Sequence, residues 1–416
     1  MTRLVPAVLR DEPQYRLLFA GQLLSIFGDR VSMLVLPFAV LAVGGTVTGV
    51  VAVSVAQFLP FVVLALPAGV WADRFDRKRI VIASDAVRMV TQATAAATLF
   101  TGTATVPLLA ALAALYGAAD AFFSPAITAL VPAIVSPRNL QPANALRGLT
   151  FSLGSVLGPA IGGVLVALLG PGGGFAFDAA TFVVSVACLL RLRPAVLDAA
   201  LETATPMTER FLPSLARGWR EVVSRRWVLA FLAGWTGYSV LVLPSIFALG
   251  PALAARDYGG APGWAIITAG YGIGSVLGDL ILLAWRPRFA LRIGALALVG
   301  ASCQAAIIGS GMGVWPIAGL ELVAGICVTG CFTLWETSLQ EHIPAAQLAR
   351  VSSYDYLTST GFIPLGTLLG GALTAALGLQ PAMVLMSAVG VCTALGVLAV
   401  PAVRALPRGV TDPDPA

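Results

Sequence analysis

Long apolar runs alternate with short polar segments along the whole chain, and this spacing predicts helices that cross a membrane. A helix needs about 20 apolar residues to cross about 30 Å of hydrocarbon. Twelve runs meet this requirement, near residues 17–43, 47–71, 80–101, 106–134, 144–170, 173–191, 227–255, 261–285, 291–311, 314–341, 352–377 and 380–400. The pattern therefore predicts an all-α integral membrane protein with twelve transmembrane helices.

The composition supports this interpretation. Of the 416 residues, 58% are hydrophobic and only 11% are charged, and the mean hydropathy is +0.90. A typical soluble domain has about 25% charged residues, so a water-soluble core would not accommodate this chain.

Basic residues gather in alternate loops and predict the orientation. The loop at 74–79 and the segment 191–226, which holds seven arginines, are rich in positive charge, whereas the opposite set of loops contains only Arg256. Short loops rich in Lys and Arg stay in the cytoplasm, so we expect both termini to be cytoplasmic in the cell membrane. The first apolar run is too long for a cleavable signal peptide. The net charge of +5 then reflects topology and contact with anionic lipids, not nucleic acid.

Glycine patterns repeat between the two halves of the chain. Gly158, Gly162 and Gly163 recur as Gly366, Gly370 and Gly371, 208 residues later. Internal repeats of this type place a substrate site near the membrane midplane, between the halves. We expect a six-helix bundle at 1–191, a cytoplasmic linker at 192–226 with an amphipathic helix near 207–224, a second bundle at 227–400 and a disordered cytoplasmic tail at 401–416.

The loop after the second predicted span carries a specific motif. Residues 69–79 read GVWADRFDRKR, which resembles the signature G-x-x-x-D-R-x-G-R-[KR] of the major facilitator superfamily. The resemblance implies two six-helix bundles that work by alternating access, held by a cytoplasmic latch. The latch residues would be Gly69, Asp73, Arg74, Arg77 and Asp355.

The residue types of this loop fit a latch. Asp73 can cap a neighbouring helix N-terminus, which contributes about 1 kcal/mol, and Arg77 can form an ion pair at the same corner. Asp76 stands where the signature has glycine, and we expect it to adopt a left-handed turn, which aspartate tolerates. A basic loop that only fixes topology is the alternative.

A second motif lies in the fifth predicted span. Residues 154–163 read GSVLGPAIGG, which resembles the G-x-x-x-G-P-x-x-G-G motif of efflux proteins in the superfamily. Gly154, Gly158, Gly162 and Gly163 would form a smooth face for close helix approach, and Pro159 would kink the span. We interpret this stretch as a gating seam, with glycine-rich packing as the alternative. Segments such as FDAATFVVS at 177–185 also resemble the branch that contains the enterobactin exporter and macrolide efflux proteins.

Acidic side chains inside predicted spans are the candidates for proton coupling, because an ionisable group at the bilayer centre costs about 2.5–3.5 kcal/mol. Asp29 lies on a helical stripe with Gln22, Ser25 and Ser32, which should face a central cavity, and Asp120 lies midway along the fourth span. A buried structural ion pair is the alternative for both aspartates. The further candidates are Asp178, Glu321 and Glu336.

Cationic and aromatic residues complete the candidate set. Arg30 points roughly 100° away from its neighbour Asp29, so we expect it to pair with another helix and to supply the positive partner that the fourth span lacks. Asp85 and Arg88 are assigned to a structural latch near the cytoplasmic end of the third span. The predicted substrate cavity consists of Gln22, Tyr116, Phe123, Trp235, Tyr238 and Trp335, although packing roles explain its aromatic residues equally well.

Enzyme chemistry finds no support in the sequence. The chain has no G-x-S-x-G elbow, no cluster of metal ligands and no G-x-x-x-x-G-K-[ST] phosphate loop, so we expect no cofactor, no metal and no ATP-driven pumping. The sequence predicts a monomeric secondary transporter that exports a small amphipathic molecule in exchange for protons. An uptake symporter, a lipid-type flippase and a non-transporting sensor are the alternatives.

Overall fold

The computed structural model describes residues 7–74, 76–136, 139–192, 219–220, 222–285, 287–343, 351, 354–355 and 357–407. Over these residues the regular structure is helical, without a strand. The chain divides into two compact units. The first contains Met1–Pro206 and Gly259–Ala265, and the second contains Met207–Tyr258 and Ile266–Ala416.

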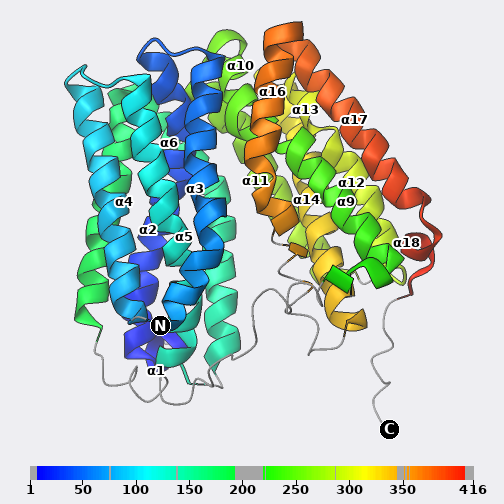
Figure 1. Ribbon diagram of the computed structural model, residues 1–416, viewed down its shortest axis with the longest axis horizontal. Helices are drawn as coiled ribbons and strands as arrows, with labels where there is room; N and C mark the ends of the chain where they lie inside the picture. The colour runs from blue at the N-terminus through cyan, green and yellow to red at the C-terminus, as the bar shows by residue number, and fades with distance from the viewer. Residues whose placement is uncertain are drawn as a thin grey trace. The chain divides into compact units, whose positions relative to one another are not determined.

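The first unit is built from one short helix and five long ones (Figure 1). In chain order they are α1 (Ala7–Asp11), α2 (Pro13–Ala42), α3 (Val47–Arg74), α4 (Arg77–Phe100), α5 (Val106–Ile134) and α6 (Leu140–Arg191). Helix α2 packs along α6, α3 packs along α5, and α4 contacts both α5 and α6.

The second unit is built from α9 (Arg226–Leu241), the π-helical turn η3 (Ser245–Leu249), α10 (Gly250–Asp257), most of α11 (Ala261–Ala284), α12 (Ala290–Ser302), α13 (Gln304–Ile308), α14 (Val314–His342), the π-helical turn η4 (Leu357–Gly361), α16 (Ile363–Leu377), α17 (Leu379–Ala399) and α18 (Pro401–Ala405). Helix α12 packs against α14 and α17, and α9 packs against α16 and α17.

Nine helices of the described chain are long and apolar enough to cross a membrane. One of them, the apolar part of α6, covers the fifth and sixth predicted spans together. Helix α4 is not among the nine, and α16 is apolar but shorter. The structure thus confirms a helical chain with many apolar helices, while the number of twelve spans stays a prediction.

The boundary between the fifth and sixth predicted spans is a glycine break inside α6. Gly170 has φ 69° and ψ −179°, the non-helical position within this long helix. A positive φ of this size favours glycine because a Cβ atom would clash with the backbone. The non-helical break in α6 therefore lies at Gly170, while the kink that the sequence predicts at Pro159 stays a prediction.

The repeated glycines are sites of close helix approach within each unit. A Cβ atom on Gly158 would lie 2.3 Å from Cβ of Arg30 on α2, and a Cβ atom on Gly366 would lie 2.4 Å from the carbonyl oxygen of Val240 on α9. Missing side chains let helix backbones approach closely. The repeat thus places the same type of contact in both units, between α6 and α2 and between α16 and α9.

The turn before α4 differs from the expected one. Asp76 has φ −55° and ψ 111°, and its side chain accepts a hydrogen bond from the backbone N–H of Lys78 at 2.9 Å. Asp76 is therefore the N-cap of α4, and its conformation is not left-handed. An N-cap satisfies one of the free N–H groups at a helix start, which explains why aspartate fits where the superfamily signature has glycine.

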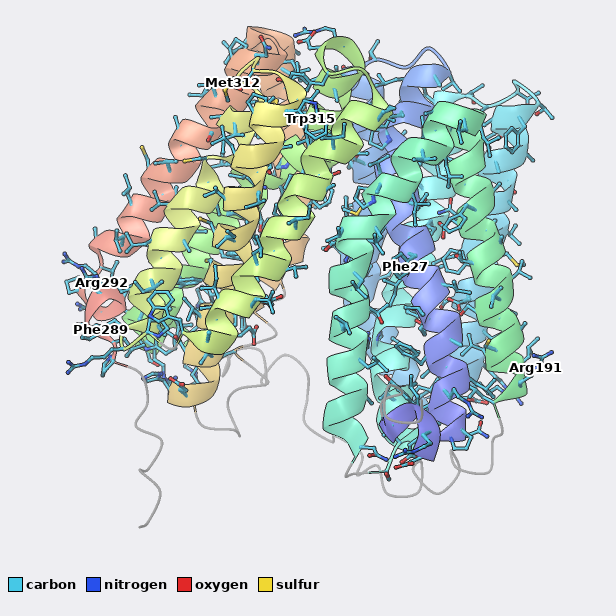
Figure 2. All side chains as sticks on the ribbon, turned by 180° about the vertical axis from the view of Figure 1, so that it is seen from behind. Phe27, Arg191, Phe289, Arg292, Met312 and Trp315 are labelled. Carbon is cyan, nitrogen blue, oxygen red and sulfur yellow. The ribbon has the colours of Figure 1, made fainter. Side chains whose placement is uncertain are left out.

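Several predicted features lie outside the described residues. These are the surroundings of Gly69, the side chains of Asp73 and Arg74, most of the linker helix near 207–224, and the tail from Arg408 onward. Arg77 opens α4. Within the first unit, Arg191 lies at the same end of the bundle as α1 (Figures 1 and 2). Within the second unit, Phe289 and Arg292 lie at the end opposite Met312 and Trp315 (Figure 2).

The contact at Gly158 leads to a stability prediction. Gly158→Ala forces Arg30 and the backbone of α2 to move, and we expect a loss of about 1–3 kcal/mol, as for other overpacked sites. Gly148→Ala on the same helix is the control, because a Cβ atom there meets no other atom within 4 Å. The measurement is the apparent unfolding midpoint of the purified protein in detergent. Equal midpoints for the two variants would contradict the close approach of α2 and α6.

Candidate functional site

The guanidinium of Arg88 lies at the centre of an acidic cluster in the first unit. It pairs with Asp85 on α4, with Asp120 on α5 at 3.2 Å and with Asp29 on α2 at 3.8 Å. The Arg88 side chain is 1% exposed and that of Asp85 is 0% exposed, whereas those of Asp29 and Asp120 are 32% and 38% exposed. Three helices thus contribute to one cluster, buried on one side and open on the other.

Aromatic rings enclose the same guanidinium. Its central carbon lies 4.0 Å from the ring centre of Phe123 and 4.7 Å from that of Phe182. A cation over an aromatic face is attracted by the ring quadrupole, more strongly where water is excluded. The rings therefore replace part of the hydration that Arg88 loses on burial.

Hydrogen bonds orient the aspartates around Arg88. The hydroxyl of Tyr116 donates to Asp29 at 2.6 Å, and the hydroxyl of Ser185 donates to the second oxygen of Asp85 at 2.6 Å. If all three aspartates are ionised, the cluster carries two negative charges in excess of Arg88. Isolated buried charge is very unfavourable, so the geometry favours the binding of protons or of a cationic group.

A cavity of about 240 Å³ opens onto this cluster within the first unit. Its charged lining residues are Asp29, Arg30, Arg88, Asp120 and Arg147. Its aromatic lining comes from Phe61, Phe123 and Phe151. An apolar cavity of roughly 150 Å³ accepts benzene, so the volume here admits a small organic molecule.

The polar stripe on α2 is divided between the cavity and the bundle interior. Gln22 and Asp29 line the cavity. Ser25 and Ser32 are buried, and Ser32 accepts a hydrogen bond from Gln92 of α4 at 2.7 Å. The two serines do not line this cavity, although Ser32 lines a smaller one in the same unit, and the expectation that the whole stripe faces a central cavity stays a prediction.

Asp178 is also buried rather than wet. It is 0% exposed, and it accepts a hydrogen bond from the side-chain nitrogen of Gln92 at 2.6 Å. Thr181 donates to the backbone carbonyl of Asp178 at 2.7 Å. In this conformation Asp178 belongs to a polar network between α4 and α6.

Arg30 does not provide the positive partner of the aspartates. Its guanidinium lies 5.9 Å from the ring centre of Phe151 on α6, and the structure gives it no ion pair within the described residues. Arg88 occupies the expected role instead, because it contacts both Asp29 and Asp120.

The second unit holds a separate polar network. The hydroxyl of Tyr238 donates to the side-chain oxygen of Gln304 at 2.6 Å, and Gln304 donates to Glu321 at 2.7 Å. Glu321 is 2% exposed, and its other carboxyl oxygen is buried with no hydrogen-bond partner in the described chain. The network links α9, α13 and α14.

The remaining predicted residues of the second unit pack against one another. Trp335 is 1% exposed, stacks on Phe231 at 4.4 Å between ring centres and donates to Asp355 at 2.8 Å. Trp235 stacks on Tyr238, and Glu336 is half-buried on α14. In this conformation the packing alternative describes the three aromatic residues, and Asp355 is bound to Trp335 within its own unit.

Arg88 is the residue of this cluster whose position the sequence did not predict. It lies about midway along α4, not near the end of the span. The sequence does carry a signal for a buried polar face, because Asp85, Arg88 and Gln92 lie at helical spacing on one side of the helix. Helix α4 is also absent from the nine apolar helices of the described chain. A helix face with this much charge must pack inside the bundle.

Comparisons with known proteins identify the family. The model of the Major Facilitator Superfamily matches residues 18–362. The chain belongs to the major facilitator superfamily. It is therefore a transporter and a multi-pass cell-membrane protein of all-α architecture, as the resemblance of its motifs implies.

Relatives of this superfamily member include efflux proteins. It is 28% identical over 408 residues to the multidrug efflux pump Tap of Mycobacterium tuberculosis, covering 95% of this chain and 94% of Tap. It is 27% identical to the enterobactin exporter EntS of Citrobacter koseri, covering 83% and 82%, and 22% identical to macrolide efflux protein A of Streptococcus pyogenes, covering 91% and 93%. The predicted resemblance to this branch is confirmed.

Solved structures support the fold. A crystal structure of the peptide transporter POT matches with a TM-score of 0.74 at 14% identity, covering 94% of this chain and 95% of the other. At that identity the likeness establishes the superfamily fold alone.

The burial of Arg88 leads to a second prediction. Arg88→Gln leaves Asp85 buried without its cation, and breaking a buried pair in this way costs about 3–5 kcal/mol. The double variant Asp85→Asn, Arg88→Gln removes the uncompensated charge, so we expect it to recover part of the apparent unfolding midpoint. Arg256→Gln, which breaks the exposed pair with Asp257, is the control and should change little. A double variant no more stable than Arg88→Gln would contradict this account.

Proposed function

We propose that this superfamily member exports a small amphipathic molecule in exchange for protons, by alternating access. The observation that supports the proposal most directly is the cluster of Asp29, Asp120 and Arg88 beside the cavity of the first unit. Efflux pumps among the relatives favour export over uptake.

The cluster has the properties that proton exchange requires. Asp29 and Asp120 are partly exposed and face the cavity, so water and substrate have access to them. Arg88 and Asp85 are buried and paired with each other. A proton that binds Asp29 or Asp120 weakens that aspartate's attraction to Arg88, and a cationic or polar group of the substrate can take the place of the proton. Competition of this type makes the release of one depend on the binding of the other.

Asp29 is the preferred proton carrier because it also accepts the hydrogen bond from Tyr116. This bond spans α2 and α5, so a change in the charge of Asp29 alters a contact between helices. The protonation state is thereby connected to helix packing in the first unit. Asp120, Asp178, Glu321 and Glu336 stay secondary candidates.

The transport prediction concerns Asp29→Asn. An amide accepts the bond from Tyr116 but carries no proton, so we expect the variant to lose export driven by a proton gradient while keeping part of the energy-independent exchange. The measurement is transport of a panel of dyes and antibiotics in proteoliposomes. Asp11→Asn, at an exposed pair with Arg10 on α1, is the matched control. Unchanged driven export in Asp29→Asn would remove Asp29 from the mechanism, and a panel without any proton-dependent movement would favour a non-transporting role.

A further prediction concerns the latch that the motif at residues 69–79 implies. We propose that Asp73, with Arg77, holds the cytoplasmic side closed in one conformation, and that both chain termini face the cytoplasm. Asp73→Ala should then slow turnover without much change in substrate affinity. Asp76→Ala is the control, because Asp76 caps α4 and its loss should lower stability by about 1 kcal/mol with less effect on turnover. If Asp73→Ala has the same turnover as the wild type, the loop only fixes topology.

A further inference from the structure

The cavity of the first unit is lined by basic side chains as well as by acidic ones. Arg30 on α2 and Arg147 on α6 both line it, and both guanidinium groups lie near the ring of Phe151, with their central carbons 5.9 Å and 5.7 Å from its centre. Phe151 is 39% exposed, so the ring near the two cations is accessible.

The two arginines have no acidic partner among the described residues. The carboxylates that line the cavity, Asp29 and Asp120, pair with Arg88 instead. An unpaired cation in the interior of a membrane span is unfavourable and marks a functional site by default; Arg30 is in this position on α2, whereas Arg147 stands at the start of the apolar stretch of α6. Two guanidinium groups that line the cavity near one aromatic ring, without an acidic partner among the described residues, therefore favour an anionic group in the occupant.

Helix packing fixes this arrangement. The Cβ atom of Arg30 occupies the space where Gly158 lacks a side chain, and Cγ of Arg30 lies 3.4 Å from the position of a Cβ atom on Gly154. Arg30 is thus held along the glycine face of α6, on the side of Phe151 and Arg147. The glycine motif positions a cation in the cavity in addition to bringing two helices together.

We propose that Arg30, Arg147 and Phe151 form the subsite for an aromatic anion, a planar ring that bears a carboxylate, sulfonate or phosphate group. Arginine binds such groups through two parallel N–H donors, and its planar guanidinium stacks on aromatic rings. The volume of about 240 Å³ admits one or two fused rings. The inference rests on the proposed function, since it names the chemical class of the exported molecule.

Equilibrium binding of two matched probes tests the subsite. The probes are 2-naphthalenesulfonate and 2-naphthyl(trimethyl)ammonium, which share a ring and differ in charge. Binding is measured by calorimetry with the full chain in phosphatidylcholine nanodiscs. We expect the anion to bind at least ten times more tightly than the cation. Tighter or equal binding of the cation would overturn the proposal.

Variants assign the binding to the named residues. Arg30→Gln and Arg147→Gln should each weaken anion binding about ten-fold, a factor that corresponds to about 1.4 kcal/mol, and Arg147→Lys should weaken it less than Arg147→Gln. Glutamine keeps the Cβ and Cγ atoms that contact α6, so Arg30→Gln preserves the packing, and the elution profile of each variant checks the fold. Arg292→Gln is the control, because Arg292 is exposed on α12 (Figure 2). Unchanged anion affinity in both glutamine variants would overturn the proposal.

A lipid headgroup offers the same anionic chemistry, and a second arm separates the two sources. In nanodiscs that contain phosphatidylglycerol, we expect the affinity for the anionic probe to stay within two-fold. A large loss of affinity for the anionic probe in these nanodiscs, if it disappears in Arg147→Gln, would assign the arginines to lipid and overturn the small-molecule subsite.

Binding of the probe does not require a proton gradient. Arginine-dependent binding together with unchanged export in Asp29→Asn would therefore reject proton coupling through Asp29 and keep the subsite.

Discussion

The first unit depends on one buried cation. Arg88 is surrounded by three aspartates from α2, α4 and α5 and by the rings of Phe123 and Phe182. A lone arginine in the middle of a helical bundle would be very unfavourable, and a lone carboxylate would be equally so. Their mutual pairing makes both tolerable and ties three helices together. Because acidic groups outnumber Arg88 in this cluster, the same interaction that stabilises the bundle leaves capacity for protons or for a cationic group.

Close helix packing determines what the cavity offers to a ligand. Gly154 and Gly158 let the stem of Arg30 lie against α6, and this places its guanidinium near Phe151 rather than near Asp29. The cavity is consequently lined by Asp29 and Asp120, which pair with Arg88, and by Arg30 and Arg147, which lie near Phe151. A substrate that binds Arg30 and Arg147 through an anionic group can place a polar group at Asp29 or Asp120 and displace a proton there, as the proposed exchange requires.

The sequence predicts the fold class well and the site only in part. Apolar runs of about 20 residues, the DR motif at 73–74 and the repeated glycines lead to the superfamily without any coordinates. They also lead to Asp29 and Asp120, because intramembrane aspartates are rare. These sequence patterns do not predict the role of Arg88. The distance of a residue from a loop does not show which charged side chains face it from the other helices of the bundle. The packing roles of Trp335 and Asp355, and the N-cap at Asp76, likewise depend on neighbours that are distant in sequence or on local torsions that a motif does not specify.

The central claim is that carboxyl groups beside Arg88 exchange protons when substrate binds. Infrared difference spectroscopy on the full chain in lipid, with and without a transported compound, measures this exchange through the carbonyl stretch of protonated carboxyl groups. The account predicts a substrate-induced loss of that band in the wild type, and its absence in Asp29→Asn. A spectrum with no change in the carboxyl region, or the same change in both proteins, would contradict it.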